Sequence, residues 1–167
     1  MLRSAASLAA TTALWASSAF GLSYELAAVI DGAQETPPVV TLGTGTMTGT
    51  YDDVTNLLTW TISYSNLTGT INNAHFHGPA PVGTPAGVRV SIPFTAGLTA
   101  DTLIGSATIT NPFETELLGG LWYVNIHSTF QSGGEIRGQV SAVVVPEPAT
   151  LGLVGLGLAA LALRRRR

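Results

Sequence analysis

Hydrophobic and polar residues alternate along most of the chain, in short runs separated by turn-forming residues. In the run 71–77, Ala74 and Phe76 alternate with His75 and His77. A period of two residues is typical of a strand that buries one face, and the threonine, valine and isoleucine of these runs favour strands. The pattern predicts eight strands, at residues 24–30, 45–51, 57–64, 71–77, 88–92, 104–110, 121–127 and 135–142.

Turn signals between these runs support an all-β fold. Asp-Gly, Gly-Pro and Gly-Gly pairs, which mark tight turns, lie at residues 31–32, 78–79, 119–120 and 133–134. Residues 114–118 are expected to form one helical turn. Many short strands with so few helical residues predict a single β-sandwich or partly closed barrel.

The first 21 residues have the pattern of a secretory signal peptide. Arg3 supplies a positive charge, residues 5–15 form a short apolar helix-forming run, and small residues follow at 17–19. Signal peptidase removes segments with this order of features, and we place the cleavage between residues 19 and 22. The alternative is a retained anchor helix, but the run is shorter than the ~20 residues that a membrane span needs.

The segment 146–167 at the other end contains three features in a fixed order. Pro146, Glu147 and Pro148 come first, and an apolar run at 151–163 follows. The chain then ends in four arginines, Arg164, Arg165, Arg166 and Arg167. Because proline does not continue a helix, the Pro-Glu-Pro sequence is expected to be extended and accessible.

The apolar run of this segment predicts a short transmembrane helix. Its helical length would be about 20 Å, against a hydrocarbon core of about 30 Å. The terminal arginines would hold that end on the cytoplasmic side as a membrane stop. We therefore predict a transient anchor in the inner membrane.

This order of features resembles the PEP-CTERM sorting signal of bacteria. The resemblance implies that a membrane exosortase cleaves the chain near Pro-Glu-Pro, and that the product reaches the cell surface or the extracellular matrix. It also implies a bacterium that makes extracellular polysaccharide, so polysaccharide and surface proteins are the expected partners. An ordinary C-terminal tail anchor is the alternative.

Charge and composition change the picture mainly for the body of the chain, residues 22–145. This body has two basic residues, Arg89 and Arg137, against nine acidic residues, which gives a net charge of −7. Nucleic acids are bound through lysine and arginine, so DNA and RNA are not expected partners. The absence of cysteine excludes disulfides, thiolate metal sites and cysteine nucleophiles.

Side chains that can bind a metal concentrate in three of the predicted strands. Alternation places His75 and His77 on one face of their strand, and His127 on the polar face of its own strand. If these strands are neighbours, the three imidazoles converge with the carboxylate of Glu135. Imidazole and carboxylate groups are ligands for zinc or copper, so a Cu or Zn site is one interpretation.

The other interpretation is a hydrogen-bonded polar network without an ion. In this network Glu135 pairs with Arg137, and Asn125 and the histidines hold the loop at residues 78–80. Gln139 shares the face of Arg137 and belongs to the same set. The residues alone leave both interpretations open.

The same stretches resemble the CHRD domain, which is named for chordin and is found in many exported bacterial proteins. The resemblance covers residues 24–143, with matching motifs at 32–38, 43–45, 74–80, 120–127 and 134–139. Small departures occur at Thr36 and Phe76. The resemblance implies an Ig-like β-barrel with faint similarity to copper–zinc superoxide dismutases, and no established activity for the domain.

Two functions follow as hypotheses. The first is a non-enzymatic exported protein of the surface or matrix, with no catalytic residues, whose CHRD domain is a binding or structural module. The second is a copper or zinc protein with superoxide-dismutase-like or other redox chemistry. Three histidines are too few for a bridged binuclear site, and a shared fold is not evidence of shared chemistry. We therefore expect the first function.

Overall fold

The computed structural model describes residues 21–146 and 148–164. Its strands are β1 (Ser23–Asp31), β2 (Thr44–Asp52), β3 (Leu57–Ser65), β4 (Ile71–His77), β5 (Val88–Ser91), β6 (Asp101–Thr108), β7 (Tyr123–Ser128), β8 (Ile136–Gln139) and β9 (Ser141–Val145). Its helices are the 3-10 helix η1 (Gly32–Gln34), α1 (Phe113–Leu118) and α2 (Pro148–Arg164). The prediction of an all-β fold is confirmed.

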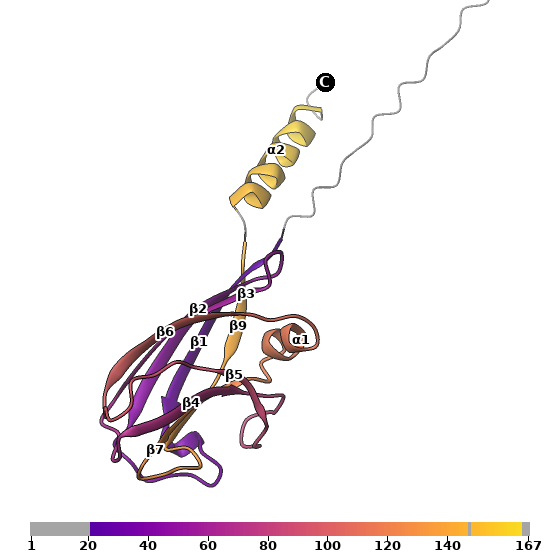
Figure 1. Ribbon diagram of the computed structural model, residues 1–167. Helices are drawn as coiled ribbons and strands as arrows, with labels where there is room; N and C mark the ends of the chain where they lie inside the picture. The colour runs from indigo at the N-terminus through magenta and orange to yellow at the C-terminus, as the bar shows by residue number, and fades with distance from the viewer. Residues whose placement is uncertain (1–20, 147, 165–167) are drawn as a thin grey trace, which may run out of the picture.

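The strands form an antiparallel sandwich, which Figure 1 shows as two curved layers. The hydrogen-bonded order is β5-β4-β7-β8-β1-β2-β3-β6, and β9 also pairs with β1. β8 and β1 share only the pair Asp31 and Arg137, whereas β1 and β2 pair along their whole length. One layer is therefore β5-β4-β7-β8, and the other is β9-β1-β2-β3-β6.

The last predicted strand, at 135–142, is two strands in the structure. β8 pairs with β7, from Ile136 opposite Ile126 to Gln139 opposite Tyr123. After Val140, β9 leaves this layer and pairs with the first half of β1. The N–H of Val140 donates to the carbonyl of Trp122 at 2.9 Å. This backbone group therefore stays hydrogen-bonded where the chain passes from one layer to the other.

Strand alternation builds the core between the layers. In β1, Leu26, Ala28 and Ile30 are buried while the residues between them are exposed. The ring of Trp60 on β3 packs edge-on against Phe76 on β4, with 5.2 Å between ring centroids. Each large apolar side chain buried in this way contributes about 1.5–3 kcal/mol, which fixes the direction in which each strand faces.

The C-terminal segment differs from its prediction at Pro148. This residue is the first of α2, a position where proline is tolerated because its missing N–H would have no helical partner. Pro146 is exposed and non-helical, as expected. Figure 1 shows α2 beyond the end of the sandwich, and its described leucines are exposed, namely Leu153, Leu156, Leu158, Leu161 and Leu163.

No helix within residues 21–146 and 148–164 combines the length and the apolar character needed to cross a membrane. The transient anchor therefore stays a prediction. Residues 1–20 of the predicted signal peptide, Glu147 and the arginines at 165–167 lie outside the described residues.

Candidate functional site

The candidate site lies on the outer face of β4, β7 and β8. β4 pairs with β7, and β7 pairs with β8, so the three strands are neighbours, which is the condition under which the histidines were expected to converge. One cross-strand row consists of His75, Asn125 and Arg137. The next row consists of His77, Tyr123 and Gln139.

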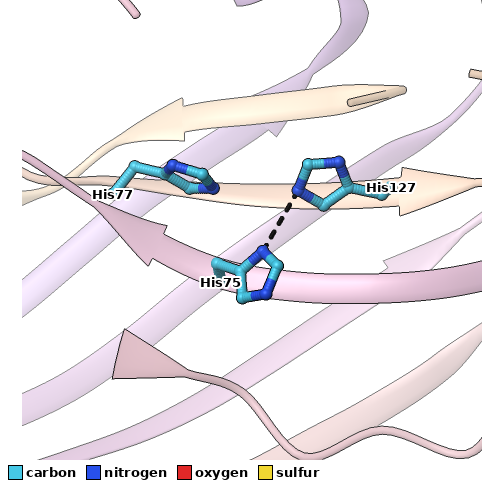
Figure 2. Close-up of side chains that lie close together, drawn as sticks. All are labelled: His75, His77 and His127. Carbon is cyan, nitrogen blue, oxygen red and sulfur yellow. Dashed lines mark hydrogen bonds between the residues drawn. The ribbon is translucent and has the colours of Figure 1, made fainter. Parts of the chain in front are cut away.

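The three histidines of the chain form a cluster on this face, as Figure 2 shows. One ring nitrogen from each of His75, His77 and His127 lies within 4.8 Å of the other two. Nδ1 of His75 and Nε2 of His127 are 3.3 Å apart. His77 is 9% exposed, and the other two are half-buried.

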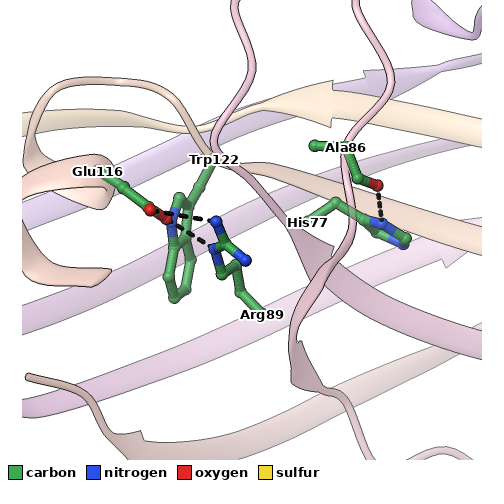
Figure 3. Close-up of polar contacts among 5 residues, drawn as sticks. All are labelled: His77, Ala86, Arg89, Glu116 and Trp122. Carbon is green, nitrogen blue, oxygen red and sulfur yellow. Dashed lines mark hydrogen bonds and ion pairs between the residues drawn. The ribbon is translucent and has the colours of Figure 1, made fainter. Parts of the chain in front are cut away.

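Backbone carbonyls orient two of the imidazoles. Nδ1 of His77 donates to the carbonyl of Ala86 at 2.9 Å (Figure 3), and Nδ1 of His127 donates to the carbonyl of Ser132 at 2.9 Å. A carbonyl only accepts, so each Nδ1 carries the hydrogen and each Nε2 carries the lone pair. Nε2 of His77 is buried and has no hydrogen-bond partner among the described residues.

Burial also lowers the pKa of all three histidines. Desolvation is the largest cause at each of them, because burial penalises the charged imidazolium. The charges of His127 and His77 lower the pKa of His75 further, whereas the hydrogen bond to Ala86 partly offsets the effect at His77. The three rings are therefore neutral at pH 7, with lone pairs available to a cation.

Glu135, predicted to join the histidines, does not do so. Its carboxylate accepts hydrogen bonds from the N–H of Thr68 at 2.6 Å, the N–H of Gly69 at 3.3 Å, and the hydroxyls of Thr41 and Ser128. Glu135 lies one residue before β8, where strand alternation no longer decides the direction of a side chain. It also makes no ion pair with Arg137, contrary to the expected network.

The structure does contain a polar network on this face, with other contacts than the expected ones. The guanidinium carbon of Arg137 lies 3.4 Å from the ring centroid of Tyr123, and the ring of His77 stacks on Tyr123 at 5.1 Å. Nε2 of Gln139 donates to the carbonyls of Ala80 and Gly120 at 2.9 and 2.8 Å. Gln139 and His77 thus hold the segment 78–87, whereas Asn125, expected to hold the loop at 78–80, makes no side-chain hydrogen bond to it among the described residues.

The sequence did not single out Glu35, the acidic residue whose charge acts on Arg137. Glu35 is 8% exposed. Burial raises its pKa to about 7, although the charge of Arg137 and the N–H of Thr36 act in the opposite direction. Oε1 of Glu35 and Oδ1 of Asn125 have no partner among the described residues. The sequence did carry one signal for Glu35: it is the acidic residue of the motif at 32–38 that resembles the CHRD domain.

Gly134 makes room for these two groups. A Cβ at this position would lie 2.4 Å from Oδ1 of Asn125 and 2.5 Å from Oε1 of Glu35, and the φ of Gly134 is +133°. Any other residue would be strained in this backbone conformation and would displace both side chains. The glycine therefore lets Glu35 and Asn125 approach each other beneath the β7–β8 turn.

Comparison with family models identifies the domain. The CHRD domain model matches residues 26–140, which include the histidine cluster and most of the chain. The chain belongs to the CHRD domain family. The model of the PEP-CTERM protein-sorting motif matches residues 144–167 of this CHRD protein, so both resemblances are confirmed. No curated protein and no solved structure matches the chain.

The two families set the coarse function of this CHRD protein. The sorting motif indicates export, processing by exosortase and sorting to the cell surface. CHRD and PEP-CTERM are not enzyme families.

A second polar cluster of the CHRD domain holds α1 in place (Figure 3). Arg89 on β5 pairs with Glu116 on α1, with Nε and Oε2 2.7 Å apart. Nε1 of Trp122 donates to the same Oε2 at 3.1 Å, and Arg89 lies over the ring of Phe113. Because each of these polar groups is already paired, this cluster is structural and leaves the histidine face as the candidate site.

Proposed function

We propose that this protein is an exported, non-enzymatic component of the cell surface or extracellular matrix, and that its CHRD domain is a binding or structural module. One observation carries the proposal: a CHRD domain at 26–140 and a sorting motif at 144–167 occur in one chain. The binding face is the outer face of β4, β7 and β8, where side chains with hydrogen-bonding groups gather beside two loops.

The charge of the domain favours some partners over others. Its two arginines are both engaged, Arg89 with Glu116 and Arg137 with Tyr123, against nine acidic residues in the body. A surface of this charge supports solubility and disfavours direct binding of an anionic polymer. We expect contact with neutral polysaccharide, with anionic polysaccharide through cations, or with surface proteins.

The processing route is part of the proposal. Signal peptidase removes the N-terminal segment, and α2 then holds the chain briefly at the inner membrane. Exosortase cuts near Pro146, Glu147 and Pro148 and releases the domain for the surface or the matrix. Helix α2 has 17 residues, which at 1.5 Å each gives about 26 Å, shorter than the membrane core of about 30 Å, so the proposed anchor is a brief one.

Cell fractionation of the full chain in an exosortase-positive bacterium tests this function. The wild-type domain should reach the surface or medium without its C-terminal segment, as mass spectrometry of the purified product would show. The variant Pro146→Ala/Glu147→Ala/Pro148→Ala should stay uncut in the membrane fraction. Thr150→Ala, in the same segment, is the matched control and should behave as wild type. Wild-type protein confined to the cytoplasm would refute the proposal.

A further inference from the structure

We propose that His75, His77 and His127 form a mononuclear zinc site, with three imidazole ligands and one coordination position open to solvent. Such a site goes beyond the role in the surface or matrix and does not depend on sorting. The ligand atoms are Nδ1 of His75 and Nε2 of His77 and His127. They come from two neighbouring strands, so the sheet itself holds the ligands together.

The spacing of these nitrogens fits a tetrahedral ion. Two nitrogens bound at about 2.0–2.1 Å to a tetrahedral zinc lie about 3.3 Å apart. Nδ1 of His75 and Nε2 of His127 are separated by 3.3 Å. The whole group fits within 4.8 Å, so closing it around an ion needs a movement of about 1.5 Å at most. Square-planar copper would need adjacent nitrogens about 2.8 Å apart, which fits less well.

The backbone hydrogen bonds of the cluster leave Nε2 of His77 and of His127 as ligand atoms. Nδ1 of His75, which donates to Nε2 of His127 in this tautomer, becomes a ligand once its hydrogen moves to the other nitrogen of the ring. The carbonyls of Ala86 and Ser132 accept from Nδ1 of His77 and His127, which turns each Nε2 toward the centre of the cluster. Metal-binding histidines commonly use their second nitrogen in this way, because the bond fixes the tautomer and the ring orientation. The loops at 78–87 and 129–134 thus supply the groups that orient the ligands.

The environment of Nε2 of His77 favours a metal site over a hydrogen-bonded network. Within the described residues it is buried without a partner, and buried polar atoms in native proteins are nearly always paired with protein, water or an ion. A contact between His75 and His127 satisfies only those two rings. An ion at the centre of the cluster would occupy the lone pair of His77 together with the other two.

The charges around the cluster permit a divalent cation. All three ligands are neutral, so the ion keeps its charge beside a domain whose acidic residues outnumber its basic ones by seven. The nearest cation is Arg137, whose charge also lowers the pKa of His77. Arg137 in turn lies over Tyr123 and is attracted to Glu35, and Glu35 partly compensates its charge.

Zinc binding by the exported, processed protein, purified without a histidine tag, tests the site. Isothermal titration with zinc chloride and mass spectrometry of the dialysed protein should give one zinc per chain. His75→Asn and His77→Gln should each weaken zinc binding about 100-fold or more. Asn72→Ala, an exposed change on the same strand, should leave zinc binding unchanged. Circular dichroism of each variant reports whether it is folded.

Three outcomes would overturn the proposal. We take a dissociation constant of about 100 µM as the weakest affinity of a specific site. A folded wild-type chain that takes up no zinc at this concentration would show that the zinc site does not exist. Equal zinc uptake by wild type and both histidine variants would place the ion elsewhere. Uptake of copper alone would refute the assignment to zinc. If His77→Gln unfolds, His75→Asn decides, because His75 is only half-buried and, within the described residues, no backbone carbonyl orients its ring.

Discussion

At the scale of single residues, the two buried acids near β8 have opposite properties. The carboxylate of Glu135 accepts hydrogen bonds from two backbone N–H groups and two hydroxyls. Burial raises its pKa, but the bonds from Ser128, Thr41, Thr68 and Gly69 outweigh burial and leave the pKa lowered. At Glu35 burial outweighs the charge of Arg137 and the hydrogen bond from the N–H of Thr36, so its pKa is raised. Glu135 is therefore a structural anion, and Glu35 is a group that gains a proton near neutral pH.

Replacing Glu135 with alanine should destabilise the domain without affecting zinc. The change removes the acceptor of the part-buried N–H groups of Thr68 and Gly69, and losing a buried charged acceptor of this kind costs about 3 kcal/mol. Urea unfolding measures the difference in the free energy of unfolding. Glu25→Ala, exposed on β1, is the control and should change that free energy by less than about 0.5 kcal/mol. A loss of zinc binding in folded Glu135→Ala would assign the carboxylate to the site after all.

Glu35 should make stability depend on pH in a defined window. Its pKa is raised from 4.5 to about 7 on folding, so between these values the folded state binds more protons than the unfolded state. The contribution of Glu35 to stability is therefore complete below pH 4.5 and is lost as pH rises through 7. Glu35→Gln should remove this loss, seen as a flatter curve of Tm against pH than in the wild type.

The control for this pH experiment is Glu25→Gln, which makes the same change of charge at an exposed position. The histidines act in the opposite direction, because their lowered pKa values favour the folded state as pH rises through 6.5. Their effect is common to both variants and to the wild type. Parallel curves for wild type and Glu35→Gln would show that Glu35 does not titrate in this window.

At the scale of elements, the alternation of polar and apolar residues predicted the direction of site side chains that lie inside strands. It did not predict the direction of those outside strands. The strand 71–77 agrees with β4 at both ends, and its two histidines share the polar face because every second side chain must enter the core. Glu135 precedes β8 and Glu35 follows η1. Their directions depend on contacts with residues distant in sequence, such as Thr68 and Arg137, which no local period contains.

The segment 78–87 is an element that positions His77. The N–H of Ala86 donates to the hydroxyl of Tyr123 at 3.0 Å, while its carbonyl accepts from His77. Tyr123→Phe removes this acceptor and should cost about 1 kcal/mol. It should also speed hydrogen–deuterium exchange at Ala86 and weaken zinc binding about tenfold through the less firmly held ring of His77.

Tyr24→Phe, on the other layer of the sandwich, is the matched control for this loop experiment. It should leave exchange at Ala86 and zinc affinity at their wild-type values. Faster exchange in Tyr123→Phe with unchanged zinc affinity would mean that the loop does not orient His77. Unchanged exchange would mean that the hydroxyl does not hold the loop.

At the scale of the whole molecule, the boundary between domain and sorting segment coincides with the end of strand pairing. β9 pairs with β1 from Ser141 opposite Ala27 to Val145 opposite Ser23. Pro146 follows directly and is exposed, and the sorting motif begins in the same place. A cut near Pro-Glu-Pro therefore removes α2 without taking a paired strand from the sandwich.

Two truncations test whether the fold is built to survive this cut. Residues 22–145 should unfold with a Tm within about 2 °C of the full chain, because the described leucines of α2 are exposed and add no core. Residues 22–140 lack β9, and should lose on the order of 3–5 kcal/mol as the ladder along β1 is opened. Thermal and urea unfolding measure both. A large loss of stability in 22–145 would mean that the sorting segment is part of the fold, and exosortase cleavage would then release a destabilised domain rather than a finished one.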